Sequence, residues 1–359
     1  MDELQQLRAF GEDVAGPSEG ALSRGRRGLV EHIGSRPTAT KSSSKKCFAL
    51  LSGTTALAAG ALVATLVFTN VLGLAGWRGG ADAAAASALS DAAAATIETA
   101  DPIVGPGQYL KVDTEAVYVI QAQNEDWENI AYLETQNGQV YIPADYNDDW
   151  VWVREQSEAL RVFGVGFEDE VEDWVANHSS PEEVIRAPEG RFYNGEPKDL
   201  GLAELPRDPQ QLLNYIYRVT AGQGPGVDYQ AFDFISATLR TGAVPAELRA
   251  ALYRAAAGIP GVEITAKSAT LNGRTGIAFG IEDKNGYLHE IVIDPETGLL
   301  IGERLVQLFD SKLVPVFAGE VVGWTSVTSS VVDSAPAGGS LCGHGRPVGG
   351  VGSGKCDTR

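Results

Sequence analysis

Residues 262–309 read VEITAKSATLNGRTGIAFGIEDKNGYLHEIVIDPETGLLIGERLVQLF and decide the fold. Segments of strand length are separated by Asn272-Gly273, by Asn285-Gly286 and by a turn through Glu296-Thr297-Gly298. Asn-Gly between hydrophobic runs is a strong hairpin signal, because both residues tolerate the positive φ that a two-residue turn requires. The stretch therefore predicts an antiparallel meander.

Helices are expected directly upstream of this meander. Asp208 and Pro209 are typical of a helix N-cap and first turn, and an apolar stripe at helical spacing follows them. A second helix is expected through Phe232–Leu239, and a third begins at Pro245 and ends before Gly258. The region 208–258 is thus predicted to be helical.

Further strands are expected on both sides of the helices. Residues 108–123, 129–143 and 148–156 read QYLKVDTEAVYVIQAQ, NIAYLETQNGQVYIP and DDWVWVREQ, with Asn137-Gly138 expected to form a hairpin turn. Residues 321–333, VVGWTSVTSSVVD, predict one more strand. Antiparallel blocks separated by helices predict an α+β domain over residues 107–333, with a curved antiparallel sheet packed on helices.

Two segments carry weaker patterns. Residues 165–207 contain an acidic run and several prolines, and they predict a long acidic loop with a short helix near Pro181–Ile185. Residues 334–359 are Gly-rich and are expected to form a disordered tail. The sequence assigns no role to either segment.

The longest uncharged stretch lies before this domain. Residues 47–74 read CFALLSGTTALAAGALVATLVFTNVLGL. As a helix they would be roughly 42 Å long, more than the ~30 Å of a bilayer core, so they predict a transmembrane helix over 47–77. Lysines on the N-terminal side place the N-terminus in the cytoplasm and the large domain outside the cell membrane. A cleaved signal peptide is the alternative, although this apolar run is longer than such peptides require.

The segments on either side of the anchor have distinct patterns. Residues 1–46 predict two short cytoplasmic helices, whose apolar faces offer a partner-binding surface of Leu4, Leu7, Leu22, Leu29 and Ile33. The alternative is a weakly ordered tail that lies on anionic lipid. Residues 78–106 are Ala-rich and predict a juxtamembrane helix with a linker.

Charge and motifs argue against several classes of function. The chain has 47 Asp and Glu against 28 Lys and Arg, a net charge of −19, which argues against nucleic acid as a partner. Its 4 histidines stand in no HExxH pattern, and neither CxxC nor GxSxG occurs. We therefore expect no catalytic residues, no metal site and no cofactor, and we predict that the protein is not an enzyme.

Two small sets of residues are candidates for other roles. Trp150 and Trp152 alternate with valines on one expected strand, so they and Phe279 are candidate lining of a ligand groove. The competing interpretation places these aromatic rings in the core. Cys342 and Cys356 lie on the oxidising side of the membrane and are candidates for a disulfide that closes a short loop.

Several segments together resemble a family of actinobacterial single-pass membrane proteins. They are MDELQQLRAF, GPGQYLKV, VPAELRAALYRAAAGIPGVEI, IDPETGLLIGERL and VVGWTSV. The resemblance implies an ectodomain similar to the half-barrels of periplasmic lipoprotein carriers and of sensors that regulate anti-sigma factors. Genes of this family are often found near those of extracytoplasmic-function sigma factors. The family supplies no catalytic or binding residues that could be transferred to this sequence.

Two functional hypotheses follow. In the first, the ectodomain is a sensor and residues 1–46 bind a cytoplasmic regulator such as a sigma factor. In the second, the protein is a membrane-anchored binding module for a lipid, an acyl chain or a lipoprotein.

Overall fold

The computed structural model describes residues 79–123, 128–164, 166–179, 181–192, 201–341 and 357–358. All of them belong to one compact unit of the chain, Gly60–Arg359. The expected cytoplasmic helices, the expected transmembrane helix and the pair Cys342 and Cys356 lie outside the described residues. Within the described ranges, no helix is both long and apolar enough to cross a membrane.

The described elements are five helices and thirteen strands. The helices are α3 (Ala83–Glu98), α4 (Glu168–His178), α5 (Pro209–Val219), α6 (Val227–Arg240) and α7 (Ala246–Ala256). The strands before α5 are β1 (Tyr109–Gln123), β2 (Asn129–Thr135), β3 (Gly138–Pro143), β4 (Asp149–Arg154), β5 (Ala159–Phe163) and β6 (Glu183–Pro188). Those after α7 are β7 (Glu263–Leu271), β8 (Arg274–Glu282), β9 (Tyr287–Ile293), β10 (Leu300–Gln307), β11 (Val321–Val332), β12 (Ser340–Leu341) and β13 (Asp357–Thr358).

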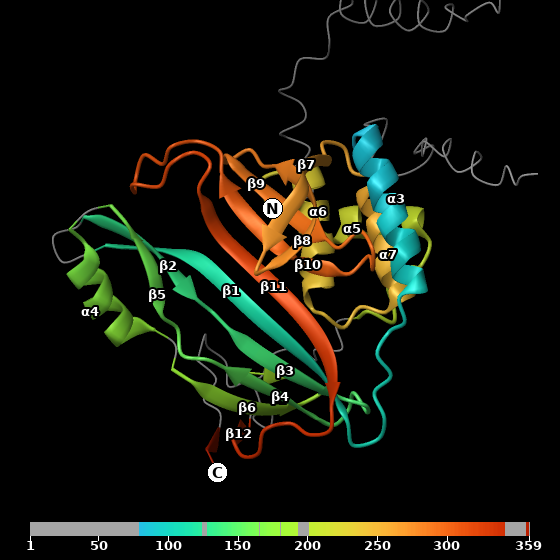
Figure 1. The fold of residues 1–359 in the computed structure, drawn as a ribbon, viewed down its shortest axis with the longest axis horizontal. Helices are drawn as coiled ribbons and strands as arrows, with labels where there is room; N and C mark the ends of the chain where they lie inside the picture. Colours follow the sequence, from blue (N-terminus) through green and yellow to red (C-terminus); the bar gives the residue numbers. More distant parts are fainter. Residues whose placement is uncertain are drawn as a thin grey trace, which may run out of the picture. The chain divides into compact units, whose positions relative to one another are not determined.

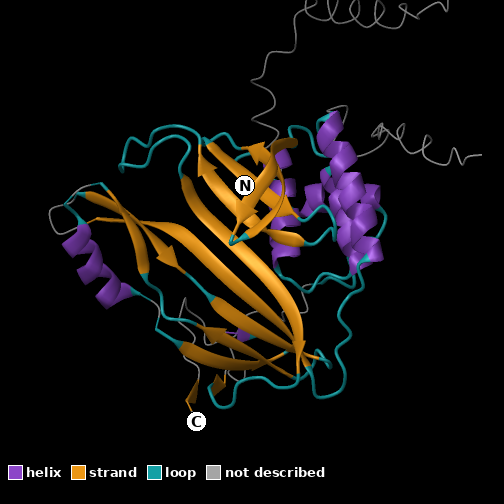
Figure 2. Ribbon diagram, in the orientation of Figure 1, coloured by secondary structure: helices purple, strands orange, loops and turns teal. Residues whose placement is uncertain are grey.

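These strands form one open sheet. Their order is β13-β12-β6-β4-β3-β1-β11-β10-β9-β8-β7, and β2 and β5 branch from β1. The pairs are antiparallel except for β12 beside β6, which makes the sheet mixed. Helices α3, α5, α6 and α7 gather beside the β7–β10 part of the sheet (Figures 1 and 2). The predicted α+β class, with a sheet packed on helices, is confirmed.

The meander forms as predicted. Asn272 and Gly273 have φ of 47° and 73°, the pair of positive values that a type I′ turn between β7 and β8 requires. In the next turn the Asp283 carboxylate accepts hydrogen bonds from the backbone N–H groups of Asn285 and Tyr287, both at 2.8 Å. The turn before β10 lies against α3, where Gly298 has a φ of 64°.

The predicted hairpin at Asn137-Gly138 is wrong. β2 and β3 both pair with β1, β2 with its second half and β3 with its first half, so the chain continues in one direction through these residues. The side chain of Asn137 accepts a hydrogen bond of 3.1 Å from the backbone N–H of Ala116. The amide therefore replaces a missing bond of the β-ladder instead of initiating a turn.

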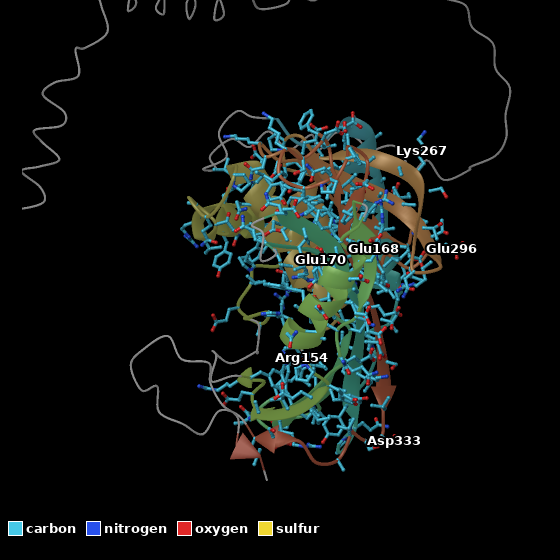
Figure 3. All side chains as sticks on the ribbon, turned by 90° about the vertical axis from the view of Figure 1, so that its left-hand side faces the viewer. Arg154, Glu168, Glu170, Lys267, Glu296 and Asp333 are labelled. Atoms are coloured by element: carbon cyan, nitrogen blue, oxygen red, sulfur yellow. The ribbon has the colours of Figure 1, made fainter. Side chains whose placement is uncertain are left out.

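The predicted acidic loop is also wrong in part. Helix α4 and strand β6 lie within it, and the expected helix near Pro181–Ile185 is strand β6, paired with β4. Val171, Trp174 and Val175 share one face of α4 and pack on β2, while acidic residues such as Glu168 and Glu170 are exposed (Figure 3). Acidic side chains in a first helical turn are favourable, because they complement the helix dipole.

Helix α3 belongs to the core of this unit. The Asp82 carboxylate caps it by accepting hydrogen bonds from Ala84 N and Ala85 N, at 2.9 and 3.3 Å. Its buried face, which includes Leu89, packs on α7 and β7. The same apolar core continues through α5 and α6 to the inner face of the sheet. The predicted cap at Asp208 is confirmed, since its carboxylate accepts a 2.9 Å hydrogen bond from Gln211 N.

Candidate ligand-binding site

Two adjoining cavities lie between the sheet and the end of α6. The larger has a volume of about 620 Å³ and the smaller about 480 Å³. Ile142 of β3 lines both, and the segment from Arg240 to Pro245, between α6 and α7, contributes to each. We call the two cavities together the hollow.

The larger cavity has an apolar floor supplied by three neighbouring strands. β1 contributes Val112, β3 contributes Val140, and β4 contributes Trp150 and Trp152. The Trp150 indole donates a hydrogen bond of 3.1 Å to the carbonyl oxygen of Tyr146, which fixes the position of the ring. The Trp152 ring lies 5.5 Å from the ring of Phe192, centroid to centroid, and together they form a continuous aromatic wall.

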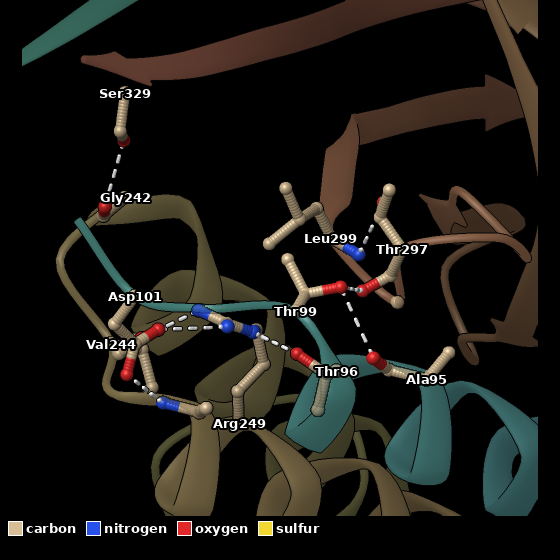
Figure 4. Close-up of polar contacts among 12 residues, drawn as sticks. Ala95, Thr96, Thr99, Asp101, Gly242, Val244, Arg249, Thr297, Leu299 and Ser329 are labelled. Atoms are coloured by element: carbon tan, nitrogen blue, oxygen red, sulfur yellow. Dashed lines mark hydrogen bonds and ion pairs between the residues drawn. The ribbon is translucent and has the colours of Figure 1, made fainter.

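The smaller cavity lies beside a buried arginine of α7. The Arg249 guanidinium donates hydrogen bonds to Thr96, to the Val244 carbonyl at 2.7 Å and to the Asp101 carboxylate at 3.0 Å (Figure 4). Asp101 also accepts a 2.7 Å hydrogen bond from Ala246 N at the start of α7. These contacts hold α3, α7 and the α6–α7 connection in one arrangement, so this wall of the hollow is preformed.

A polar network lies beside the larger cavity, and its Arg240 lines that cavity. Glu303 of β10 accepts hydrogen bonds from Arg240 and Ser236 of α6, and its Oε2 lies 3.2 Å from His289 Nε2. The other imidazole nitrogen, Nδ1, is buried 3.5 Å from Asp233 and has no hydrogen-bond partner among the described residues. The network therefore ties α6 to the sheet at the point where Arg240 reaches the cavity.

The charges within this network stabilise one another. Burial by itself would raise the pKa of the Glu303 carboxyl, but the hydrogen bond with His289 and the positive charge of Arg240 lower this pKa to about 2. Burial would lower the pKa of Arg240, whereas the nearby Glu303 carboxylate raises it. Both groups are therefore ionised at neutral pH and act as a fixed ion pair.

The sequence-predicted groove residues have separate positions. Trp150 and Trp152 both line the larger cavity, although only 3% of Trp150 is accessible. Phe279 lies in β8 within the helix–sheet core, only 1% exposed, and lines neither cavity of the hollow. Leu4, Leu7, Leu22, Leu29 and Ile33 lie outside the described residues, as do Cys342 and Cys356.

Sequence reasoning missed the polar end of the site. His289 and Glu290 contact different groups, as strand alternation predicts: His289 faces Glu303, and Glu290 forms an ion pair with Arg304. The meander predicts that β9 and β10 are neighbours, which could have suggested the contact between His289 and Glu303. The contribution of α6 could not be read from local sequence. Within the described ranges, no group of three or more His, Cys, Asp or Glu is arranged to hold a metal ion.

Comparison with known proteins gives a weak likeness at the level of structure. No family model matches the chain, and no curated protein matches it. The crystal structure of MucB in complex with MucA(peri) is 9% identical over 70% of this chain and 57% of that chain, with a TM-score of 0.21. The crystal structure of MucB is 11% identical over 71% and 61%, with a TM-score of 0.20. The Pseudomonas aeruginosa MucA/MucB complex is 11% identical over 71% and 59%, with a TM-score of 0.21.

The likeness to these structures extends over part of their length and is weak. The chain spans about three fifths of the length of those proteins. Superpositions with such low TM-scores identify no shared site and no shared activity. The expected membership in an actinobacterial membrane family has no sequence match and stays a prediction.

Proposed function

We propose that the protein is a single-pass membrane protein whose extracytoplasmic domain binds a lipid or acyl chain in the hollow. The observation that carries the proposal is the unfilled space of about 620 Å³ against Trp150 and Trp152, next to a further 480 Å³. Volumes of roughly 300–1,000 Å³ with apolar and aromatic lining are usual for small-molecule sites.

The surroundings of the hollow favour binding over catalysis. The ionisable groups at its end are engaged with one another, since Glu303 accepts hydrogen bonds from Arg240 and Ser236. A carboxylate with a pKa of about 2 is a weak general base at neutral pH. The geometry thus favours a binding module.

A cavity-filling variant tests the proposal. Ala237 lines the larger cavity from an exposed position on α6, so Ala237→Trp would occupy the cavity with little disturbance of the core. Ala94→Trp, at an exposed position of α3, introduces the same side chain away from the hollow. The full chain is purified in detergent, and binding of an anthroyloxy-stearate probe is measured by fluorescence anisotropy.

We expect Ala237→Trp to weaken probe binding at least about tenfold, which corresponds to about 1.4 kcal/mol, and Ala94→Trp to leave it unchanged. Equal affinities for both variants would refute binding in the hollow. If the affinities differ as expected, mass spectrometry of lipids extracted from the purified chain would identify the natural ligand class.

A regulatory role is the second proposal, and it rests on sequence. The apolar stripes through Leu4 and Leu7, and through Leu22, Leu29 and Ile33, suit a cytoplasmic protein partner such as a sigma factor. Crosslinking of residues 1–46 in native membranes, with Leu29→Asp and Ile33→Asp as controls, tests it. A partner captured equally well by both variants would contradict the proposed surface.

A further inference from the structure

The loop between β10 and β11, residues 308–320, exposes several large apolar side chains. Phe309 is 68% exposed, Leu313 70% and Phe317 57%. Single exposed apolar residues are common on soluble proteins, whereas several on one short loop mark an interaction surface. We call Phe309, Leu313 and Phe317 the apolar tip.

The apolar tip is held in place by the polar groups of its own loop. Ser311 Oγ accepts hydrogen bonds from Leu313 N and Val314 N at 3.2 and 3.3 Å. Asp310 accepts one from Ala318 N at 3.0 Å, and Glu320 accepts one from Phe317 N at 2.7 Å.

The loop is also anchored through apolar contacts. Val314 and Val316 are buried against Ala131, Phe163 and Val322. The loop therefore buries its valines and satisfies its backbone, and it still directs the three large side chains outward.

The apolar tip lies at the same end of the unit as the start of α3. Asp82 N donates a 2.9 Å hydrogen bond to the carbonyl of Val262, directly before β7, and the first residues of β7 pair with the last residues of β8. The turn after β8 bonds the loop, because Leu308 N donates to the Gly286 carbonyl at 2.7 Å. Both the start of α3 and the orange loop between β10 and β11 lie at the upper end of Figure 1.

That end of the unit is constrained to lie close to the expected membrane anchor. The uncharged stretch ends at Leu74, and α3 begins at Ala83. The intervening eight residues span at most about 29 Å even when fully extended. From β7 to β10 there are three strand spacings of about 4.8 Å, so the ends of these two strands lie about 14 Å apart across the sheet.

We propose that the apolar tip inserts into the headgroup region of the bilayer that holds residues 47–74, an inference that rests on the proposed membrane anchor. Aromatic side chains beside a lysine suit this region, and Lys312, next to Leu313, is exposed. The loop is then a second contact with the membrane and fixes the orientation of the ectodomain above it.

Photocrosslinking in vesicles tests the inference. The full chain is reconstituted into mixed vesicles of phosphatidylethanolamine and phosphatidylglycerol, with benzoyl-phenylalanine in place of Phe309, Leu313 or Phe317. Ile103, 90% exposed in the segment after the other end of α3, is the matched control position. We expect lipid adducts at the three tip positions and none at Ile103.

Two outcomes would overturn the inference, and they can be distinguished. Retention of the chain in the membrane after an alkaline carbonate wash, without lipid adducts at the tip, would refute the insertion alone. Release of the chain by the same wash would refute the anchor and, with it, the insertion.

Discussion

Replacing Glu303 by Gln is expected to destabilise the unit by about 3 kcal/mol at neutral pH. The side chain is nearly buried, and its pKa falls from an ordinary 4.5 to about 2 because His289 and Arg240 interact with the carboxylate. At about 1.36 kcal/mol for each pH unit, this difference corresponds to about 3 kcal/mol of stability at neutral pH. A neutral glutamine cannot supply the charge.

The same reasoning predicts a pH dependence with a definite sign. In the unfolded chain the Glu303 carboxyl gains a proton as the pH falls through about 4.5, whereas in the folded protein it stays ionised until about pH 2. The stabilisation is therefore fully present above about pH 5 and is lost between about pH 5 and pH 2. The Gln variant lacks this loss, so the stabilities of the two proteins should converge as the pH approaches 2.

Urea unfolding of the full chain in detergent measures both effects through tryptophan fluorescence, since Trp150 is buried and Trp152 is half-buried. The matched control is Asp113→Asn, which removes a partly exposed pair in which Lys111 Nζ lies 2.7 Å from the carboxylate. Pairs of this kind contribute about 0–1 kcal/mol. The reasoning would be refuted if Glu303→Gln cost no more than Asp113→Asn, or if it kept the pH dependence of the native chain.

Two further substitutions and one candidate disulfide have defined outcomes. Gly298→Ala should lower the free energy of unfolding by about 1–3 kcal/mol, because Gly298 has a φ of 64° and an added Cβ would lie 2.3 Å from the Ala92 carbonyl oxygen. Thermal unfolding measures this loss, and an unchanged Tm would contradict the observed turn. Phe279→Ala should lower the free energy of unfolding, measured in urea, by about 3–5 kcal/mol and leave the affinity for the fatty-acid probe unchanged, because the ring fills the core and not the hollow. Weaker probe binding by the folded variant would place Phe279 in the site. Cys342 and Cys356 are expected to form a disulfide, because β12 and β13 pair Leu341 with Asp357, and each of these residues is next to one of the cysteines in the sequence. Peptide mapping without reductant checks for the bond. Two thiols that react freely with maleimide in the native protein would exclude it.

Two Asn-Gly pairs, Asn272-Gly273 and Asn137-Gly138, show how far sequence determines this fold. Asn272-Gly273 forms a two-residue turn with both φ values positive, as its flanking strands require. Asn137-Gly138 has the same residues between similar strands, yet continues straight through the sheet, because β1 is long enough to pair with both β2 and β3. Strand length and partner choice are tertiary properties, and a dipeptide carries no information about them.

Helix α4 and the polar end of the candidate site were not predicted from sequence, for different reasons. The spacing of Val171, Trp174 and Val175 indicates α4 once the acidic residues are recognised as its exposed face. By contrast, Glu303 and Arg240 lie 63 residues apart and meet only because α6 crosses the sheet. Trp150 and Trp152 were found because alternation within one strand predicts which residues share a face.

The pairing of β1 with three strands has a consequence for solubility. A sheet without branches has two edges, but this one forks at β1 and ends in β5 as well as in β7 and β13. An uncovered edge strand can pair with another copy and cause aggregation. Contacts with α3 and the exposed Lys267 protect β7, and α4 packs beside β5 with Glu168 and Glu170 directed to solvent (Figure 3). The acidic helix thus repels a second molecule at the edge that the fork creates.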